Sequence, residues 1–139
     1  FNPRWEQPEL GISRFPSAPS AVRALRTAAD TVLARGNPVA ALDLPAPHVR
    51  EGLIVSGDVF VRSHEAVRQL RQDLPEALAV DMESAAAAQV CTSARLPLGI
   101  VRVISDRANS QAPVDFPAFL KLAAPLLRDL VVETLAHLD

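Results

Sequence analysis

Residues 77–94, ALAVDMESAAAAQVCTSA, hold the pattern that decides the fold. Ala77–Val80 is a short apolar run, which is typical of a strand covered on both faces. It leads directly into the polar residues 81–83 and then into the alanine-rich stretch 84–94. Alanine has the highest helix propensity, so this stretch predicts a helix. A strand followed at once by a helix indicates an α/β fold.

Similar units lie on both sides of this stretch. Upstream, the apolar run 52–55 predicts a buried strand, which ends at the turn 56–58 and precedes a helix over about 63–72. Downstream, residues 98–104 are rich in Ile and Val and give the strongest strand signal in the chain. We therefore expect a three-layer α/β/α fold around a central mixed, largely parallel sheet.

Two further helices are predicted towards the ends of the chain. Residues 20–35 carry apolar side chains at helical spacing, with Ser20 as the N-cap and Gly36 as the stop signal. A long helix is expected after the cap Asp115, and Pro125 inside it should produce a kink.

The composition argues against several classes of function. The chain has 139 residues, of which 49% are hydrophobic and 22% charged, as in an ordinary globular protein. A net charge of −2 with scattered arginines argues against a nucleic-acid partner, which would require a basic face. No apolar run approaches the roughly 18–20 residues of a membrane span, so we expect no membrane partner. Cys91 is the single cysteine, and a cytoplasmic location is the expectation.

No cofactor or metal is expected. The three histidines and Cys91 do not have the spacing of metal ligands. The sequence also lacks the glycine-rich motifs that cradle dinucleotides or phosphates.

Polar residues follow three of the predicted strands. They are Ser56-Gly57-Asp58, Asp81-Met82-Glu83 and Ser105-Asp106. Ligands of open α/β sheets bind where the carboxyl ends of parallel strands meet, so these residues form a candidate site. A single Asp or Ser after a strand is more often a cap or a turn former. The pattern alone leaves the two interpretations about evenly balanced.

Three ordered blocks surround these strand ends: GLIVSGDVF at 52–60, VDMESAAAAQVC at 80–91 and VRVISDRAN at 101–109. Their order and spacing, together with an F-x-x-F-L helix from Phe116, resemble the nucleoside phosphorylase/nucleosidase superfamily. Within it, the resemblance is strongest to the 5′-methylthioadenosine/S-adenosylhomocysteine nucleosidase family. The resemblance implies that residues 1–139 are the C-terminal part of a single domain. The N-terminal half, which in this family supplies a water-positioning glutamate, is then absent from the sequence.

The resemblance assigns four residues to the purine base. Phe60 would stack on the purine, and the backbone of Val61 would read the adenine edge. Ser105 and Asp106 match the pair at purine N7, where Asp106 would be the catalytic acid for the leaving group.

Two other residues are assigned to the ribose, and Asp81 and Arg102 are further substrate-binding residues. Met82 would pack against the sugar, and Glu83 would be the second catalytic residue, gripping the ribose hydroxyls. Asp81 stands where the family usually has Glu, and Arg102 would order the water or the acidic cluster. Two neighbouring positions depart from the family's usual residues: Arg107 and Asn109.

These residue types suit the cleavage of a purine N-glycosidic bond. The departing base gains negative charge, so an acid near N7 must carry a proton as the bond breaks. An aspartate has an ordinary pKa near 3.9, and burial or a neighbouring carboxylate would raise it to serve this role. An ionised Glu83 would stabilise the positive charge that develops on the ribose.

The predicted function is therefore hydrolysis of 5′-methylthioadenosine/S-adenosylhomocysteine-type nucleosides, releasing adenine. A phosphorylase of the same superfamily, which uses phosphate instead of water, is the first alternative. A non-catalytic nucleoside-binding relative or fragment is the second. The expected partners are a small purine nucleoside and a second copy of the chain in a homodimer.

Overall fold

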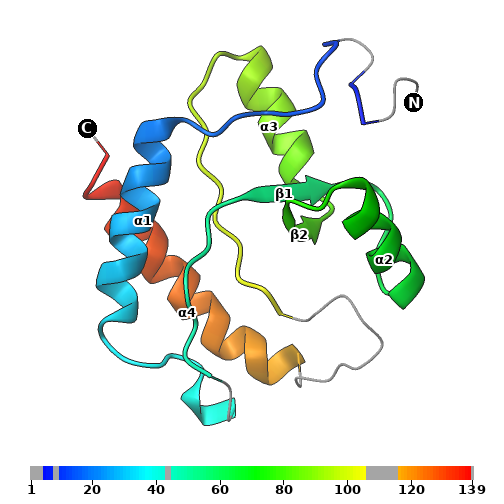
Figure 1. The fold of residues 1–139 in the computed structure, drawn as a ribbon. Coiled ribbons are helices and arrows are strands. Elements are labelled where there is room, and N and C mark those ends of the chain that lie inside the picture. Colours follow the sequence, from blue (N-terminus) through cyan, green and yellow to red (C-terminus); the bar gives the residue numbers. More distant parts are fainter. Residues whose placement is uncertain (1–4, 8–9, 43–44, 106–115, 139) are drawn as a thin grey trace.

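The computed structural model describes residues 5–7, 10–42, 45–105 and 116–138. Its elements are α1 (Pro19–Leu33), the 3-10 turn η1 (Ala40–Leu42), β1 (Leu53–Ser56), α2 (His64–Asp73), β2 (Ala77–Asp81), α3 (Ser84–Ser93) and α4 (Phe116–Leu135) (Figure 1). Helices combined with parallel strands confirm the predicted α/β class. Within the described part of the chain, no helix has both the length and the apolar character to span a membrane.

The sheet of the described residues consists of β1 and β2, which pair in parallel. Their connection runs through α2, as a parallel crossover requires. The register places Ser56 opposite Asp81, and the backbone N–H of Gly57 donates to the carbonyl of Asp81 at 3.2 Å. The carboxyl ends of the two strands therefore lie side by side at one edge of the sheet.

The hydrophobic core lies between α1 and α4, which run beside each other in Figure 1. Ala29 and Val32 of α1 are buried against Leu126 and Leu130 of α4. These positions recur at helical spacing, so each helix turns one apolar stripe towards the other. Burial of this stripe, more than local propensity, stabilises both helices.

Residues 98–104 form no strand among the described residues, so the expected third strand is wrong as a sheet element. A strand requires ladder hydrogen bonds to a neighbour, and among the described residues β1 and β2 alone form such a ladder. The extended segment is held in another way. The backbone N–H of Ala18 donates to the carbonyl of Leu98 at 2.7 Å, and a Cβ on Gly99 would lie only 2.8 Å from that of Ala21.

The extended segment nevertheless keeps the alternation of a strand. Val101 and Val103 pack against the core between α1 and α4. Arg102 and Ile104 are exposed, since successive side chains of extended backbone point to opposite sides. This alternation sends Arg102 away from the core.

The helix boundaries agree closely with the predictions, although one cap was predicted wrongly. Helix α1 begins at Pro19 with Ala18 as its N-cap residue, and Ser20 is already helical. Proline suits the first turn because its missing N–H would have no helical partner there. Helix α4 continues through Pro125, and the predicted cap Asp115 lies outside the described residues.

Candidate functional site

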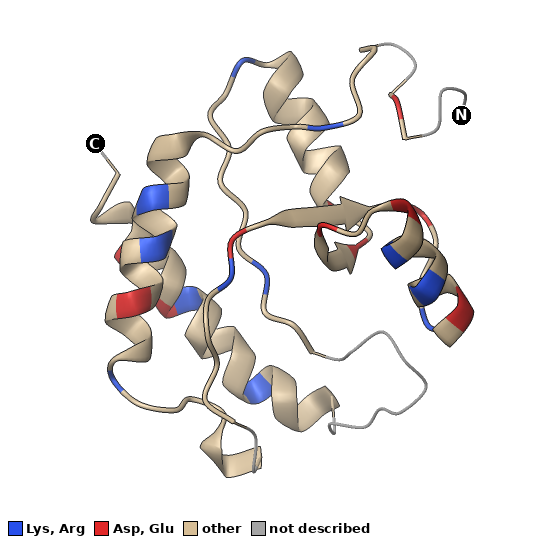
Figure 2. Cartoon of the chain, viewed as in Figure 1, with Lys and Arg blue, Asp and Glu red and all other residues tan. Residues whose placement is uncertain are grey.

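The candidate site is built around the junction of β2 and α3. Asp81 is the last residue of β2, and Glu83 occupies the N-cap position of α3. Ser84 is the first residue of the helix. The chain thus changes from strand to helix within three residues, at the edge of the sheet where β1 also ends. Figure 2 shows acidic residues at the ends of both strands.

The Asp81 side chain holds this junction together. Its residue is only 8% exposed, and its two carboxylate oxygens accept several hydrogen bonds. Oδ1 accepts the backbone N–H groups of Ser84 at 3.1 Å and Glu83 at 3.3 Å. Oδ2 accepts a short hydrogen bond from the Ser84 hydroxyl. Asp81 therefore accepts hydrogen bonds from N–H groups at the start of α3 that have no partner within the helix.

These contacts keep Asp81 ionised. Burial alone would raise the pKa of its carboxyl group, because a low-dielectric surrounding disfavours the charge. Hydrogen bonds from Ser84 and Ser56, together with the positive charge of Arg102, outweigh burial and lower the pKa below its ordinary value. Asp81 is thus a carboxylate at neutral pH and does not have the raised pKa of a general acid.

Arg102 reaches the junction from the extended segment and bridges two carboxylates. Its Nε lies 3.3 Å from Oδ2 of Asp81, and its Nη2 lies 3.3 Å from Oε2 of Glu83. The structure therefore brings together three of the predicted site residues, although they come from two separate parts of the chain.

Glu83 and Met82 are the members of this group that face solvent. The Glu83 side chain is 70% exposed, whereas that of Asp81 is 3% exposed. Met82 is also largely exposed. A guanidinium contacts this surface carboxylate on one side. The carboxylate can still accept hydrogen bonds from ligand hydroxyl groups and stabilise a nearby positive charge.

The residues predicted to bind the base lie at the end of the neighbouring strand. Phe60 and Val61 belong to the connection between β1 and α2, where Phe60 is 69% exposed and Val61 is half-buried. Ser105 is half-buried at the end of the extended segment. Asp106, Arg107 and Asn109 lie outside the described residues, so the acid itself has no described position.

Ser84 is the residue that sequence reasoning missed, and the contact between Ser56 and Asp81 was not predicted either, although Ser56 was among the strand-end residues of the candidate site. Ser84 donates a hydrogen bond to Asp81, and a hydrogen bond from Ser56 helps to lower the pKa of Asp81. The spacing Asp81-x-x-Ser84 is the available signal, because a side-chain acceptor three residues before a backbone N–H is typical of a helix N-terminus. Ser56 could not be found this way, since its pairing with Asp81 depends on the strand register.

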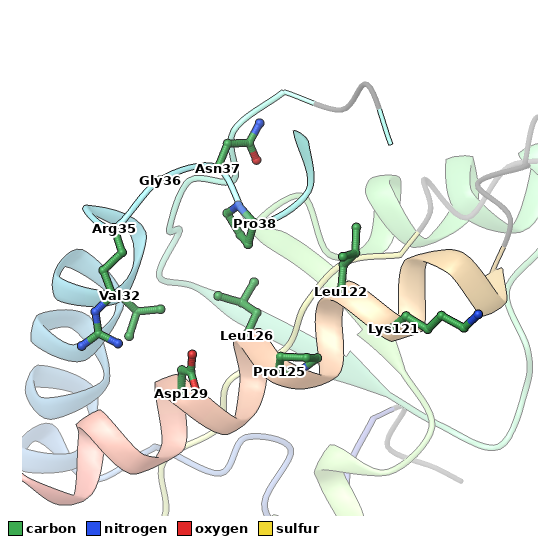
Figure 3. A pocket seen from close by; sticks show the side chains of 10 residues that line it. All are labelled: Val32, Arg35, Gly36, Asn37, Pro38, Lys121, Leu122, Pro125, Leu126 and Asp129. Atoms are coloured by element: carbon green, nitrogen blue, oxygen red, sulfur yellow. The ribbon is translucent and has the colours of Figure 1, made fainter. Parts of the chain in front are cut away.

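Other hollows of the surface do not coincide with this site. A groove of about 310 Å³ lies between the C-terminal end of α1 and the first half of α4 (Figure 3). Its walls include Val32, Pro38 and Leu126, and none of the predicted site residues lines it. In the described part of the chain, no three His, Cys, Asp or Glu side chains gather as a metal site would require.

Comparison with known proteins gives a consistent set of relatives. The sequence matches the family model described as "Phosphorylase superfamily" over residues 1–136. It is 41% identical over 90 residues to 5′-methylthioadenosine/S-adenosylhomocysteine nucleosidase of Haemophilus influenzae (strain PittEE), which covers 65% of this chain and 39% of the relative.

Solved structures of such nucleosidases resemble the fold. The structure from Neisseria meningitidis in complex with methylthio-immucillin-A has a TM-score of 0.75 and 37% identity, covering 93% of this chain and 51% of that one. The structure from Colwellia psychrerythraea 34H in complex with adenine has a TM-score of 0.78 and 28% identity, covering 96% and 50%. The chain thus spans about half the length of these proteins or less.

Proposed function

The chain belongs to the phosphorylase superfamily, and we propose that it functions as a purine nucleosidase. The reaction is hydrolysis of the N-glycosidic bond of 5′-methylthioadenosine/S-adenosylhomocysteine-type nucleosides, which releases adenine. The match to the family model also confirms the resemblance inferred from the three sequence blocks.

One observation carries this proposal: the exposed Glu83 carboxylate, backed by Arg102, at the carboxyl edge of parallel strands. As the bond to the base breaks, positive charge develops on the ribose and attracts an ionised carboxylate. Glu83 would accept hydrogen bonds from the ribose hydroxyls and stabilise that charge. Arg102 Nη2 donates a hydrogen bond to Oε2 of Glu83 at 3.3 Å and so helps to orient this carboxylate.

The base side of the reaction would use the neighbouring strand end and the residues after Ser105. Phe60 offers an exposed aromatic face for stacking on the planar purine. Asp106 would donate a proton to N7 as the base departs, and Ser105 would help to hold the base. A water molecule adds at C1′ of the ribose, so the products are free adenine and the 5′-substituted ribose.

Support from relatives is direct for the ligand class. The two similar structures are nucleosidases that contain adenine or methylthio-immucillin-A. The similar Haemophilus influenzae protein carries the same name. We therefore propose 5′-methylthioadenosine and S-adenosylhomocysteine as the substrates.

Two alternatives have observations in their favour. The family model is named for phosphorylases, which favours phosphate as the acceptor of the ribose. The exposed Phe60 and the Glu83 carboxylate beside Arg102 would equally serve a form that binds nucleosides without turnover.

Adenine release from 5′-methylthioadenosine, measured with and without phosphate, separates these three functions. A nucleosidase releases adenine and free methylthioribose without phosphate. A phosphorylase requires phosphate and yields the sugar 1-phosphate. Calorimetric binding of 5′-methylthioadenosine without adenine release under either condition would contradict the proposed hydrolysis and favour the binding protein.

We also propose a homodimer in the cytoplasm. Large apolar side chains remain exposed on two helices, among them Val90 of α3 and Val132 and Leu135 of α4. Exposed apolar surface of this kind is often covered by another subunit. Light scattering after size-exclusion chromatography tests the dimer, and a monomer at micromolar concentration would contradict it.

A further inference from the structure

Contacts within the protein occupy both oxygens of the Asp81 carboxylate. Two backbone N–H groups donate hydrogen bonds to its Oδ1, the Ser84 hydroxyl donates one to its Oδ2, and Arg102 Nε forms an ion pair with Oδ2 at 3.3 Å. With the hydrogen bond from Ser56, four donors fill the about four acceptor positions of the carboxylate. Together with its burial, this leaves Asp81 no means of contacting a ligand directly.

The guanidinium group of Arg102 contacts both Asp81 and Glu83, so the position of Asp81 affects the position of the Glu83 carboxylate. A guanidinium is planar, and its N–H groups point in fixed directions. When Asp81 fixes Nε at 3.3 Å, the direction of Nη2 is fixed as well, and Nη2 lies 3.3 Å from Oε2 of Glu83. A second connection runs through the backbone, because Oδ1 of Asp81 accepts the N–H of Glu83 itself.

The exposed fraction of the side chain increases from Asp81 through Arg102 to Glu83. The side chain of Asp81 is 3% exposed, that of Arg102 41% and that of Glu83 70%. The buried end is immobilised by several hydrogen bonds, and the exposed end is the group available to a ligand. An exposed glutamate would otherwise lose side-chain entropy when a ligand orders it.

We propose that Asp81 is a positioning residue that fixes the Glu83 carboxylate for ribose binding through Arg102. This inference replaces the direct substrate contact expected for Asp81 from the sequence. It rests on the proposed function for the identity of the ligand, whereas the contacts between Asp81, Arg102 and Glu83 do not depend on it.

The test is a double-mutant cycle on the full chain with Asp81→Asn, Glu83→Gln and the combination of both. Asparagine keeps an oxygen for the backbone N–H groups and removes the charge that holds Arg102. We expect Asp81→Asn alone to lower kcat/KM for 5′-methylthioadenosine about tenfold, within the usual range of coupled residues. In the Glu83→Gln background the same change should cost less than about twofold, because Asp81 acts through Glu83.

Effects that multiply in the double variant would overturn the proposal, since a merely structural role lowers activity in either background. Arg102→Lys is the second variant, because lysine keeps the positive charge but lacks the planar fork. It should lose about as much activity as Asp81→Asn. If Asp81→Asn does not fold, as judged by circular dichroism, unchanged activity of Arg102→Lys would overturn the proposal in its place.

A spectroscopic measurement separates this proposal from the proposed function. The ¹⁵N resonance of Arg102 Nε–H should be sharp in the wild-type chain and in Glu83→Gln, and broadened in Asp81→Asn. A sharp resonance in Asp81→Asn would overturn the anchoring of Arg102. If the resonances behave as expected but the wild-type chain neither binds nor cleaves 5′-methylthioadenosine, the proposed function fails while the anchoring stands.

Discussion

The junction between β2 and α3 and the connection between β1 and α2 lie at the same edge of the sheet, yet they are organised differently. At the junction, Asp81 is buried, accepts hydrogen bonds from the start of α3 and forms an ion pair with Arg102 of the extended segment. In the connection, Val59 is 73% exposed and Phe60 is 69% exposed. Contacts within the protein fix the side chain at the junction, whereas the connection exposes its apolar side chains to solvent.

This difference follows from the chemistry that each region would serve. A carboxylate must be oriented before it can stabilise charge, because reorientation during the reaction would cost free energy. A stacking aromatic needs only an accessible face, and its contacts form when a planar ligand arrives. Under the proposed function, the ribose side would therefore be organised in advance, and the base side would be completed by the ligand.

The largest effect is expected from removal of the acid at the base side. Asp106→Asn should lower turnover by roughly 10²–10⁴, because general acid assistance is worth about that much and an amide cannot supply the proton. Initial rates of adenine release at saturating 5′-methylthioadenosine measure the effect.

Asp30→Asn is the control, since Asp30 is an exposed aspartate of α1, a helix that carries none of the predicted site residues. It should retain turnover within about twofold, as an exposed change away from the reacting atoms does. Near-normal turnover of Asp106→Asn would show that Asp106 is not the catalytic acid.

On the ribose side, Glu83→Gln should lower turnover by about 10²–10³. Glutamine keeps a hydrogen-bonding oxygen but cannot stabilise the positive ribose, and loss of one group aimed at developing charge typically costs this much. Because the effect arises in the transition state, kcat should fall more than KM changes.

Glu65→Gln controls for loss of an acid at a helix N-terminus, because Glu65 lies exposed in the first turn of α2. Its turnover should match that of the wild type. A rise in KM alone for Glu83→Gln, with unchanged kcat, would contradict a role in charge stabilisation.

The sequence predicted the junction well because its determinants are local. The apolar run 77–80, the acids after it and the alanine-rich helix lie within eighteen residues, and their propensities agree with the fold. The arrangement of Asp81, Glu83 and Arg102 followed from the family resemblance, since Arg102 arrives from a distant segment.

The errors occurred where the outcome depends on non-local partners. Residues 98–104 have the composition of a strand, but strand formation depends on a neighbouring backbone, which composition does not reveal. The role of Ser56 likewise depends on the register between β1 and β2. The predicted N-cap Ser20 was wrong because Pro19, one position earlier, can itself begin the helix.

A smaller effect is expected in the exposed connection. Phe60→Ala should weaken adenine binding about tenfold, because base–aromatic stacking contributes roughly 1–3 kcal/mol. Isothermal titration with adenine measures it, and the unfolding midpoint should hardly change, since Phe60 is 69% exposed. Val59→Ala is the matched control in the same connection. Equal losses in the two variants would show that the base does not stack on Phe60.

The smallest effect concerns the pH dependence of stability at the junction. The folded state lowers the pKa of Asp81, because hydrogen bonds from Ser84 and Ser56 and the charge of Arg102 outweigh burial. The unfolded chain, with an ordinary pKa near 3.9, therefore binds this proton more readily. The stabilisation is complete above about pH 4 and is lost as the pH falls through the lower pKa of the folded state.

Urea unfolding of wild type and Asp81→Asn, compared between about pH 3 and pH 6, measures this contribution. The slope of the unfolding free energy with pH cannot exceed about 1.4 kcal/mol per pH unit for a single group. The wild type should show the steeper slope below about pH 4. Some slope should remain in the variant, because the backbone hydrogen bond of Glu76 and its ion pair with Arg14 also lower the pKa of that carboxyl group.

Asp58→Asn in the exposed connection should keep the wild-type slope. Equal slopes in wild type and Asp81→Asn would mean that the junction gains nothing from the Asp81 charge in the absence of ligand. The junction and the connection would then differ only in how deeply their side chains are buried. A shallower slope confined to Asp81→Asn would instead show that folding itself stabilises the ionised carboxylate at the ribose side before any ligand binds.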